Sequence, residues 1–359
     1  MGNHMDQDQG QRASDVDALL DELESEAVEQ APARPAPRGF AHTLGGLLRM
    51  REMSVLVATI LLFTGLALAT PLFFKLDNVL LVARQISLLA IIATGVTFLF
   101  VSREIDLSVG SIYGFCGIML AYMIAKWSLD PWLAMAITVA LGAVLGLVNG
   151  LVTTRFGIPS FIVTLGTLSI LRGGALLISA AWPIDVKVLR GSSFSAITAG
   201  HAGGLVPTQV LWMIGVMLIA SFVLSRTRFG SHVYATGGNE EAAVLAGVRT
   251  KQVKVICFMM TGALCGVAAG LLLGQLRSAF PTTGAGYELD IIAAVVIGGT
   301  PLFGGAGSIL GTFLGAAVLG MISNGLVLLG VSAYVEPVAK GTIIVAAILV
   351  DTVVRRRRV

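Results

Sequence analysis

Long apolar runs recur along almost the whole chain, and they restrict its fold more than any other feature. Most of them approach the roughly 20 residues that an α-helix needs to cross a bilayer. Only 13% of the residues are charged, whereas soluble domains carry about 25%. The sequence therefore predicts an all-α polytopic membrane protein with about ten transmembrane helices. The candidate spans are residues 53–74, 78–101, 107–125, 131–153, 160–181, 209–225, 253–274, 288–300, 305–330 and 336–353.

Basic residues gather on one side of these spans. The cytoplasmic side of a membrane protein is normally the one rich in Lys and Arg. If the chain starts inside, the cytoplasmic segments hold most of the basic residues, including the run Arg355–Arg358, whereas the external link 182–208 holds few. Both termini are therefore predicted to be cytoplasmic. The segment 288–300 is short and precedes a glycine-rich turn, which predicts a broken or tilted element.

Two terminal segments flank a membrane domain predicted for residues 43–354. Residues 1–42 are acidic, and residues 15–29 carry leucines at helical spacing before a proline-rich stretch. This composition is typical of a largely disordered cytoplasmic tail, and a docking helix is the alternative. Residues 355–359 form a basic cytoplasmic end.

An internal repeat connects the two halves of the membrane domain. The stretch LGLVNGLV around Asn149 resembles LGMISNGLV around Asn324, 175 positions later, and Gly166-Thr167 recurs as Gly341-Thr342 at the same offset. Spans 2–5 would then match spans 7–10, and a shift by an odd number of spans reverses the second copy. Transporters commonly contain such an inverted repeat, and chance similarity between glycine- and leucine-rich helices is the alternative.

Polar residues inside the apolar part of the chain are candidates for a solute path. The stretch SREIDLSVGS places Asp106, Ser108 and Gly110 at a membrane edge, where a charge must reach water, pair, or line a polar path. A plain cytoplasmic turn with an Arg103 ion pair is the alternative. Asn149 and Asn324 either contact a solute or hydrogen-bond neighbouring helices.

The polar segment 226–254 interrupts the second half of the chain. Asn239 is placed to cap a short helix, Glu240 and Glu241 occupy its first turn, and Gly247 is placed to end it. Basic residues flank this helix, which again indicates the cytoplasmic side. The segment either docks a soluble partner or is an ordinary capped surface loop.

Several functional classes have no support in the sequence. It contains no phosphate-binding loop of the G-x-x-x-x-G-K-[ST] type and no hydrolase or protease motif. The four histidines and three cysteines match no metal-ligand spacing, so no metal or other cofactor is predicted, and the basic surplus does not imply nucleic acid. The energy for transport must come from an ion gradient or from another chain.

Four stretches of this chain resemble the membrane permease subunits of ribose- and xylose-type sugar ABC importers. They are GVTFLFVSREIDLSVGSIYG (Gly95–Gly114), FGIPSFIVTLGTLSILRG (Phe156–Gly173), GGNEEAAVLAGV (Gly237–Val248) and the stretch Gly286–Ala316. The likeness runs from about residue 50 to residue 353 and leaves out the acidic tail. In the family, glycines precede I-D-L, where this chain has Arg103 and Glu104.

The resemblance implies an importer in the bacterial cytoplasmic (inner) membrane with several partners. These are a second permease copy, an extracytoplasmic sugar-binding protein that docks on the external link, and cytoplasmic ATP-binding subunits. The ATPase-coupling residues would be Gly237, Gly238, Asn239, Glu240, Glu241, Ala242 and Gly247. Permeases for nucleosides, branched-chain amino acids or a signalling furanose look alike at this level. An ion-coupled secondary transporter of a small polar solute is the alternative class, with Asp106 and Arg172 as coupling groups.

Overall fold

The computed structural model of the protein describes residues 51–332, 334–338 and 340–342. The predicted acidic tail, the basic end and most of the predicted span 336–353 lie outside these residues. The elements in chain order are α3 (Arg51–Ala69), α4 (Leu76–Val101), α5 (Val109–Trp127), α6 (Pro131–Phe156), α7 (Ser160–Ser179), β1 (Ile184–Asp185), the 3₁₀ turn η1 (Lys187–Leu189), α8 (Ser193–Ala199), β2 (His201–Ala202), β3 (Val206–Pro207), α9 (Thr208–Arg226), α10 (Arg228–Gly238), α11 (Glu240–Leu245), α12 (Thr250–Leu276), β4 (Ser278–Ala279), α13 (Tyr287–Ile297) and α14 (Ile309–Leu328).

Seven helices of the described chain are long and apolar enough to cross a membrane, namely α4, α5, α6, α7, α9, α12 and α14. This confirms the predicted all-α polytopic membrane protein. Helix α13 has only 11 residues. At about 1.5 Å per residue it covers roughly half of a bilayer core, which fits the broken or tilted element predicted at 288–300. The total of ten spans stays a prediction, because the last one is mostly outside the described residues.

The ends of several helices follow from local sequence chemistry. Asp130 caps α6 by accepting hydrogen bonds from the backbone N–H groups of Trp132 and Leu133 at 2.9 and 3.1 Å, and Pro131 occupies the first helical position. Gly157 ends the same helix at φ +68°. Ser308 caps α14 through the N–H of Gly311 at 3.0 Å. These signals make the boundaries of α6 and α14 readable from the sequence.

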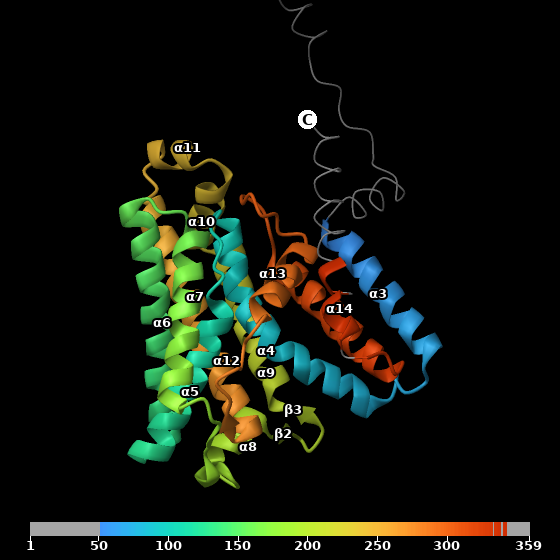
Figure 1. The fold of residues 1–359 in the computed structure, drawn as a ribbon. Coiled ribbons are helices and arrows are strands. Elements are labelled where there is room, and N and C mark those ends of the chain that lie inside the picture. Colours follow the sequence, from blue (N-terminus) through green and yellow to red (C-terminus); the bar gives the residue numbers. More distant parts are fainter. Residues whose placement is uncertain (1–50, 333, 339, 343–359) are drawn as a thin grey trace, which may run out of the picture. The chain divides into compact units, whose positions relative to one another are not determined.

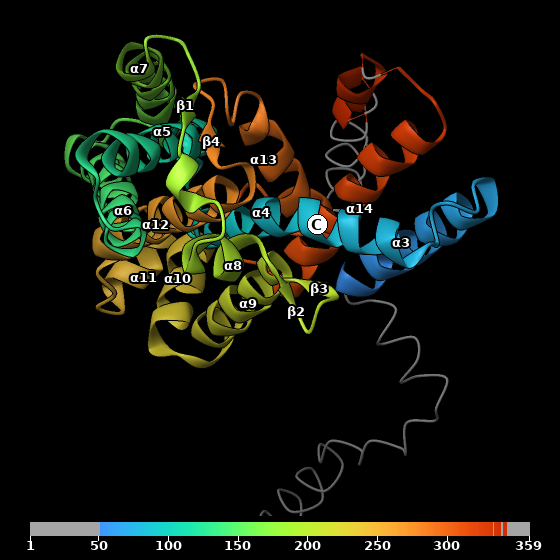
Figure 2. The same cartoon turned by 90° about the horizontal axis from the view of Figure 1, so that it is seen from below.

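Helices α4 and α12 lie side by side at the centre of the membrane domain and run in opposite directions (Figures 1 and 2). Helix α12 packs against α5 and α6, whereas α4 packs against α13 and α14. The repeat would match α4 with α12, α5 with α13 and α6 with α14. The contacts of α12 with α5 and α6 then correspond to the contacts of α4 with α13 and α14. This exchanged packing is the arrangement that the inverted repeat predicts.

The contact between α6 and α12 is a close approach of two backbones at glycines. A Cβ atom added at Gly142 would lie 2.1 Å from the carbonyl oxygen of Gly262, and one added at Gly146 would lie 2.1 Å from that of Phe258. Neighbouring helices in a membrane gain most of their attraction from such close packing of small residues. The glycines therefore fix the distance between α6 and the central helix α12.

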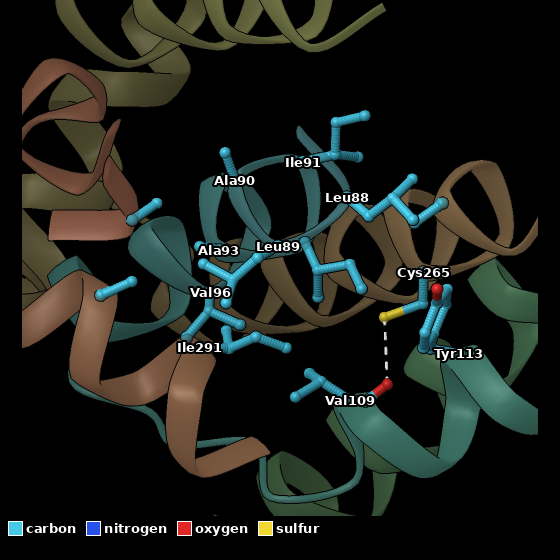
Figure 3. Close-up of a cluster of buried hydrophobic side chains, with 14 of the residues drawn as sticks. Leu88, Leu89, Ala90, Ile91, Ala93, Val96, Val109, Tyr113, Cys265 and Ile291 are labelled. Carbon is cyan, nitrogen blue, oxygen red and sulfur yellow. Dashed lines mark hydrogen bonds between the residues drawn. The ribbon is translucent and has the colours of Figure 1, made fainter. Parts of the chain in front are cut away.

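The largest apolar cluster surrounds the central pair of helices. Figure 3 shows residues of α4, such as Leu89 and Val96, packed with Val109 and Tyr113 of α5 and with Ile291 of α13. The thiol of Cys265 on α12 donates a weak hydrogen bond to the Val109 carbonyl oxygen at 3.5 Å. The start of α5 is thus held directly on α12.

Replacing Gly146 with alanine should lower the stability of the protein. The added methyl group meets the backbone of α12, so the two helices must separate, and overpacking of this kind costs about 1–3 kcal/mol. We expect a lower melting temperature in detergent, measured by loss of the monodisperse peak after heating. The control is Gly166→Ala on α7, where no atom lies within 4 Å of the added carbon. Equal melting temperatures of the two variants would contradict the close approach.

Candidate functional site

The segment Ser102–Ser108, which links α4 to α5, runs along the beginning of α7. The N–H of Ile105 donates to the hydroxyl of Ser160 at 3.2 Å, and the N–H of Leu107 donates to that of Thr164 at 3.1 Å. Backbone groups outside a helix need such partners in an apolar environment. Hydroxyls of α7 therefore allow an irregular backbone to pass through the helix bundle.

Asp106 is the fully buried centre of a hydrogen-bonded chain that joins this link to α6 and α7. Its Oδ1 accepts from the N–H of Ser108 at 2.8 Å and from its hydroxyl at 2.5 Å. The Nδ2 group of Asn149 on α6 donates to the same Ser108 oxygen at 2.9 Å, and Thr167 on α7 donates to Oδ1 of Asn149 at 2.6 Å. Three of the predicted path residues, Asp106, Ser108 and Asn149, are thus brought together.

One oxygen of Asp106 is not used by this chain. Its Oδ2 is buried and has no hydrogen-bond partner among the described residues. Burial raises the pKa of Asp106, which belongs to the link between two helices, to about 6, although the hydrogen bonds from Ser108 lower it. Such an oxygen can accept a hydrogen bond from a hydroxyl group of a solute.

The other two predicted path residues lie in different surroundings. A Cβ atom at Gly110 would lie 2.4 Å from the Gly284 carbonyl oxygen, so this glycine permits a close contact between α5 and the segment before α13. Asn324 exchanges hydrogen bonds with Asn78 at 2.9 and 3.0 Å, which ties α14 to α4. Helices α6 and α14 lie on opposite sides of α4 (Figure 2). Both predicted asparagines hydrogen-bond neighbouring helices, but only Asn149 belongs to the Asp106 chain.

Helix α11 forms the capped turn that was predicted between residues 226 and 254. The Oδ1 atom of Asn239 accepts from the N–H of Ala242 at 3.0 Å, and Glu240 and Glu241 occupy the first turn. Gly247 has φ +82°, and backbone bonds from Gly247 to Val244 and from Val248 to Ala243, both 2.9 Å, close the end of the helix. The predicted cap, acidic first turn and glycine end are confirmed.

The exposed side of α11 carries apolar side chains. Leu245 is 90% exposed and Val244 is 54% exposed, although both stand in a polar segment. Among the predicted coupling residues Gly238, Asn239, Glu241, Ala242 and Gly247 are also exposed. Exposed apolar groups within a polar rim are typical of a surface that a partner covers.

Helix α10 was not predicted, and it connects α11 to both halves of the protein. A Cβ atom at Gly237 would lie 2.8 Å from the backbone nitrogen of Gly305 and would overlap the carbonyl oxygen of Val101, the last residue of α4. The N–H of Gly305 donates to the same Val101 oxygen at 3.0 Å, and the Tyr234 hydroxyl donates to the Gly307 carbonyl at 2.7 Å. Of the predicted coupling residues, Gly237 is thus buried in a joint between α10, α4 and the turn before α14.

Lys254, in the first turns of α12, pairs with two carboxylates. Its Nζ lies 2.9 Å from Oε1 of Glu104 in the link and 2.8 Å from Oε2 of Glu240 in α11. The predicted alternative for the link was a cytoplasmic turn with an Arg103 ion pair. In the described residues the recorded ion pair of the link is that of Glu104 instead, and Arg103 is exposed at φ +69°.

Sequence reasoning missed the groups that complete this site. Ser160, Thr164 and Thr167 looked like ordinary residues of a spanning helix, and Lys254 was counted only as a basic residue beside a span. The one available signal was the repeat, which contained Thr167. Arg172, named above as a coupling group of the alternative transporter class, donates to the Thr282 carbonyl oxygen at 3.3 Å. Within the described residues no group of three or more His, Cys, Asp or Glu could hold a metal ion.

Comparison with known proteins identifies a matching family and close relatives. Residues 78–350 match the family described as branched-chain amino acid transport system / permease component. The ribose import permease protein of Escherichia coli K12 is 38% identical over 304 residues, 84% of this chain and 94% of that protein. The ribose import permease protein of Bacillus subtilis 168 is 38% identical over 302 residues, which are 84% of this chain and 93% of that protein. The autoinducer 2 import system permease protein of Photorhabdus luminescens is 33% identical over 307 residues, 84% and 89%. No solved structure gives a significant match.

Replacing Gly237 with alanine should disrupt the joint between α10 and α4. The added carbon overlaps the Val101 carbonyl oxygen, so α10 must shift away from both α4 and the turn at Gly305. We expect a loss of about 1–3 kcal/mol and a lower melting temperature in detergent. The control is the neighbouring change Gly238→Ala, where no atom lies within 4 Å of the added carbon. If both variants melt like the wild type, the joint is not packed as described.

Proposed function

Because the chain belongs to the permease-component family of branched-chain amino acid transport systems, we propose that it is the membrane permease subunit of an ATP-driven importer. The single observation behind this proposal is its match to import permeases over nearly their whole length. The membrane helices supply the path, and alternating access between the two inverted halves moves the solute across. The subunit itself is not an enzyme in this proposal.

The transported solute is a monosaccharide or a related small polyol. Two of the relatives are named for ribose import, whereas the family description names branched-chain amino acids. The buried site supports the sugar, because Asp106, Ser108 and Asn149 offer carboxylate, hydroxyl and amide groups. The unpaired Oδ2 of Asp106 can accept a hydrogen bond from a sugar hydroxyl, whereas a branched aliphatic side chain would leave it unpaired.

ATP hydrolysis takes place in separate cytoplasmic subunits that dock on α11. The sequence contains no phosphate-binding loop of its own. The exposed Leu245 and Val244 provide an apolar contact, and the caps at Asn239 and Gly247 keep the short helix rigid. The proposed complex contains two permease copies, as a homodimer in the bacterial inner membrane with both termini in the cytoplasm.

A sugar-binding protein delivers the solute to the opposite end of the helices. There the segment 182–208 forms η1, α8 and the β2–β3 hairpin, and β1 pairs with β4 (Figure 1). This pairing brings Lys187, Arg190 and Arg277 to one open pocket of about 480 Å³, together with Asp185. An excess of exposed cations suits a partner with acidic docking residues.

A substitution at Gly247, the residue that ends α11, tests the role of this helix. A valine cannot adopt φ +82° without strain, so Gly247→Val should abolish the stimulation of ATP hydrolysis by sugar-loaded binding protein in the lipid-reconstituted complex. The control is Gly247→Asn, because asparagine tolerates this conformation and should keep most of the stimulation. If Gly247→Val is stimulated like the wild type, α11 is not the coupling helix.

The alternative, an ion-coupled secondary transporter, makes the opposite prediction in the same membranes. In that case, no ATPase co-purifies and an uncoupler abolishes uptake at constant ATP.

The proposed path residues Asp106, Ser108, Gly110, Asn149 and Asn324 can be tested by uptake. Asp106→Asn keeps the oxygen that accepts from Ser108 but replaces the unpaired Oδ2 with an NH₂ donor. If Oδ2 accepts a hydrogen bond from the sugar, uptake should fall by about tenfold, as expected for a loss of about 1.4 kcal/mol, while the assembled complex is recovered in equal amount. Alanine at Ser108, Asn149 or Asn324 should also lower uptake without lowering assembly. Unchanged uptake in Asp106→Asn would exclude Asp106 from the path.

A further inference from the structure

The ion pairs of Lys254 join the predicted coupling helix to the segment that holds Asp106. One partner, Glu240, is the first residue of α11, and the other, Glu104, stands two residues before Asp106. Lys254 itself is fixed on α12, the central helix. A single ammonium group, which has three N–H donors, thus connects the neighbouring helices α11 and α12 to the link between α4 and α5, which is far from them in the sequence.

Burial distinguishes the two carboxylates. The side chains of Glu104 and Lys254 are 10% and 12% exposed, whereas that of Glu240 is 41% exposed. A nearly buried carboxylate needs its cation to stabilise the negative charge, because water cannot reach the carboxylate and take the place of the cation. Water can replace the cation of Glu240 at little cost. The contact between Lys254 and Glu240 is therefore the one that a movement of α11 can break and remake.

The backbone around Glu104 is short and held at both ends. The N–H of Glu104 donates to the Leu99 carbonyl at the end of α4 at 2.9 Å, and the next residue, Ile105, donates to Ser160 of α7. Asp106 follows directly with its hydrogen bonds to Ser108. Because the backbone is held on both sides of Glu104, a displacement of the Glu104 carboxylate also displaces Asp106.

We propose that Lys254 is a positioning residue that transmits the movement of α11 to the Asp106 segment through its shared ion pairs with Glu240 and Glu104. This inference rests on the proposed coupling role of α11. When α11 is docked as in the structure, the two carboxylates share one cation. When α11 moves away, Lys254 pairs with Glu104 alone. This ion pair becomes stronger and shifts the link between α4 and α5 toward α12.

The joint at Gly237 offers a second connection between the same parts, made by the backbone. The Gly237 joint does not involve charge, so neutral substitutions of the ion-pair residues distinguish it from the connection through Lys254. Lys254→Met keeps most of the aliphatic stem and removes only the charge, whereas Lys254→Arg keeps the charge. A packing role predicts that methionine is tolerated, and the ion-pair role predicts that only arginine is tolerated.

The test measures ATP hydrolysis by the whole complex in lipid, with and without binding protein loaded with ribose. We expect Lys254→Met to reduce the stimulation by about fivefold or more, at the lower end of typical allosteric couplings, and Lys254→Arg to keep most of it. The matched control is Lys251→Met. Lys251 is an exposed neighbour on the same helix as Lys254, and it forms no ion pair within the described part of the chain. This variant should behave like the wild type.

Loss of Lys254 alone leaves Glu104 buried without a cation and could prevent folding. The triple change Glu104→Gln, Lys254→Met and Glu240→Gln removes all three charges together, so no buried charge is left unpaired. We expect this variant to assemble and to show the same loss of stimulation as Lys254→Met, because groups that act as a unit are not additive.

Two results would overturn the proposal in distinguishable ways. If wild type is stimulated and the triple variant is stimulated equally, the ion pairs do not transmit the movement, and the coupling role of α11 is untouched. If loaded binding protein does not stimulate the wild type with any of several sugars, the importer function fails and the role of Lys254 fails with it.

Discussion

The packing of α12 against α4 on one side and against α6 on the other is the constraint on which the rest of the structure depends. It needs small residues at fixed places, because a Cβ atom at Gly95 would lie 2.8 Å from the Cα of Thr261, and the glycines of α6 and α12 meet backbone to backbone. In a bilayer the lipid tails are as apolar as the helix surfaces, so the hydrophobic effect does not drive helices together. Close packing therefore has to supply the attraction between them. In the described chain, α12 carries α5 and α6, and α4 carries α13 and α14.

Among the described residues, the buried charged side chains are those of Glu104 and Asp106, and each has a specific arrangement. The link at Asp106 obtains its backbone partners from hydroxyls of α7, and Asp106 itself is held by Ser108. At the start of the same link, Glu104 pairs with a lysine that also holds α11. The proposed solute site and the proposed docking surface for the ATPase are therefore connected by a short run of residues. In the proposed importer this closeness lets a local event at α11 change the solute site.

The sequence predicted the parts of the protein that rest on local chemistry. Apolar runs located the membrane helices within a few residues, and the short α13 was recognised from its length and the glycines that follow it. The cap at Asn239 and the left-handed Gly247 were predicted because helix termini have strong residue preferences. The group of Asp106, Ser108 and Asn149 was also named in advance, since polar residues in apolar spans are rare.

The parts that were missed depend on contacts between distant segments. Helix α10 ends in two glycines, which usually mark a loop, and the contact with Val101 and Gly305 explains only the first of them, Gly237. Lys254 has no neighbouring acidic residue in the sequence that would identify its partners. Asn324 shares its sequence context with Asn149 but bonds with Asn78, because the repeat conserves the helix and not the polar group that faces it. Pairing across the bundle becomes visible only in three dimensions.

The most direct measurement of the central claim is site-specific photo-crosslinking of the assembled complex in membranes. A photoreactive amino acid at Leu245, which is 90% exposed at the end of α11, should form an adduct with the ATP-binding subunit. The same group at Val188, 66% exposed in the segment between α7 and α9, should form an adduct with the sugar-binding protein and none with the ATPase. An adduct of the ATPase at Val188, or its absence at Leu245 in a complex that contains the ATPase, would contradict the proposed docking of the energy-supplying subunit on α11.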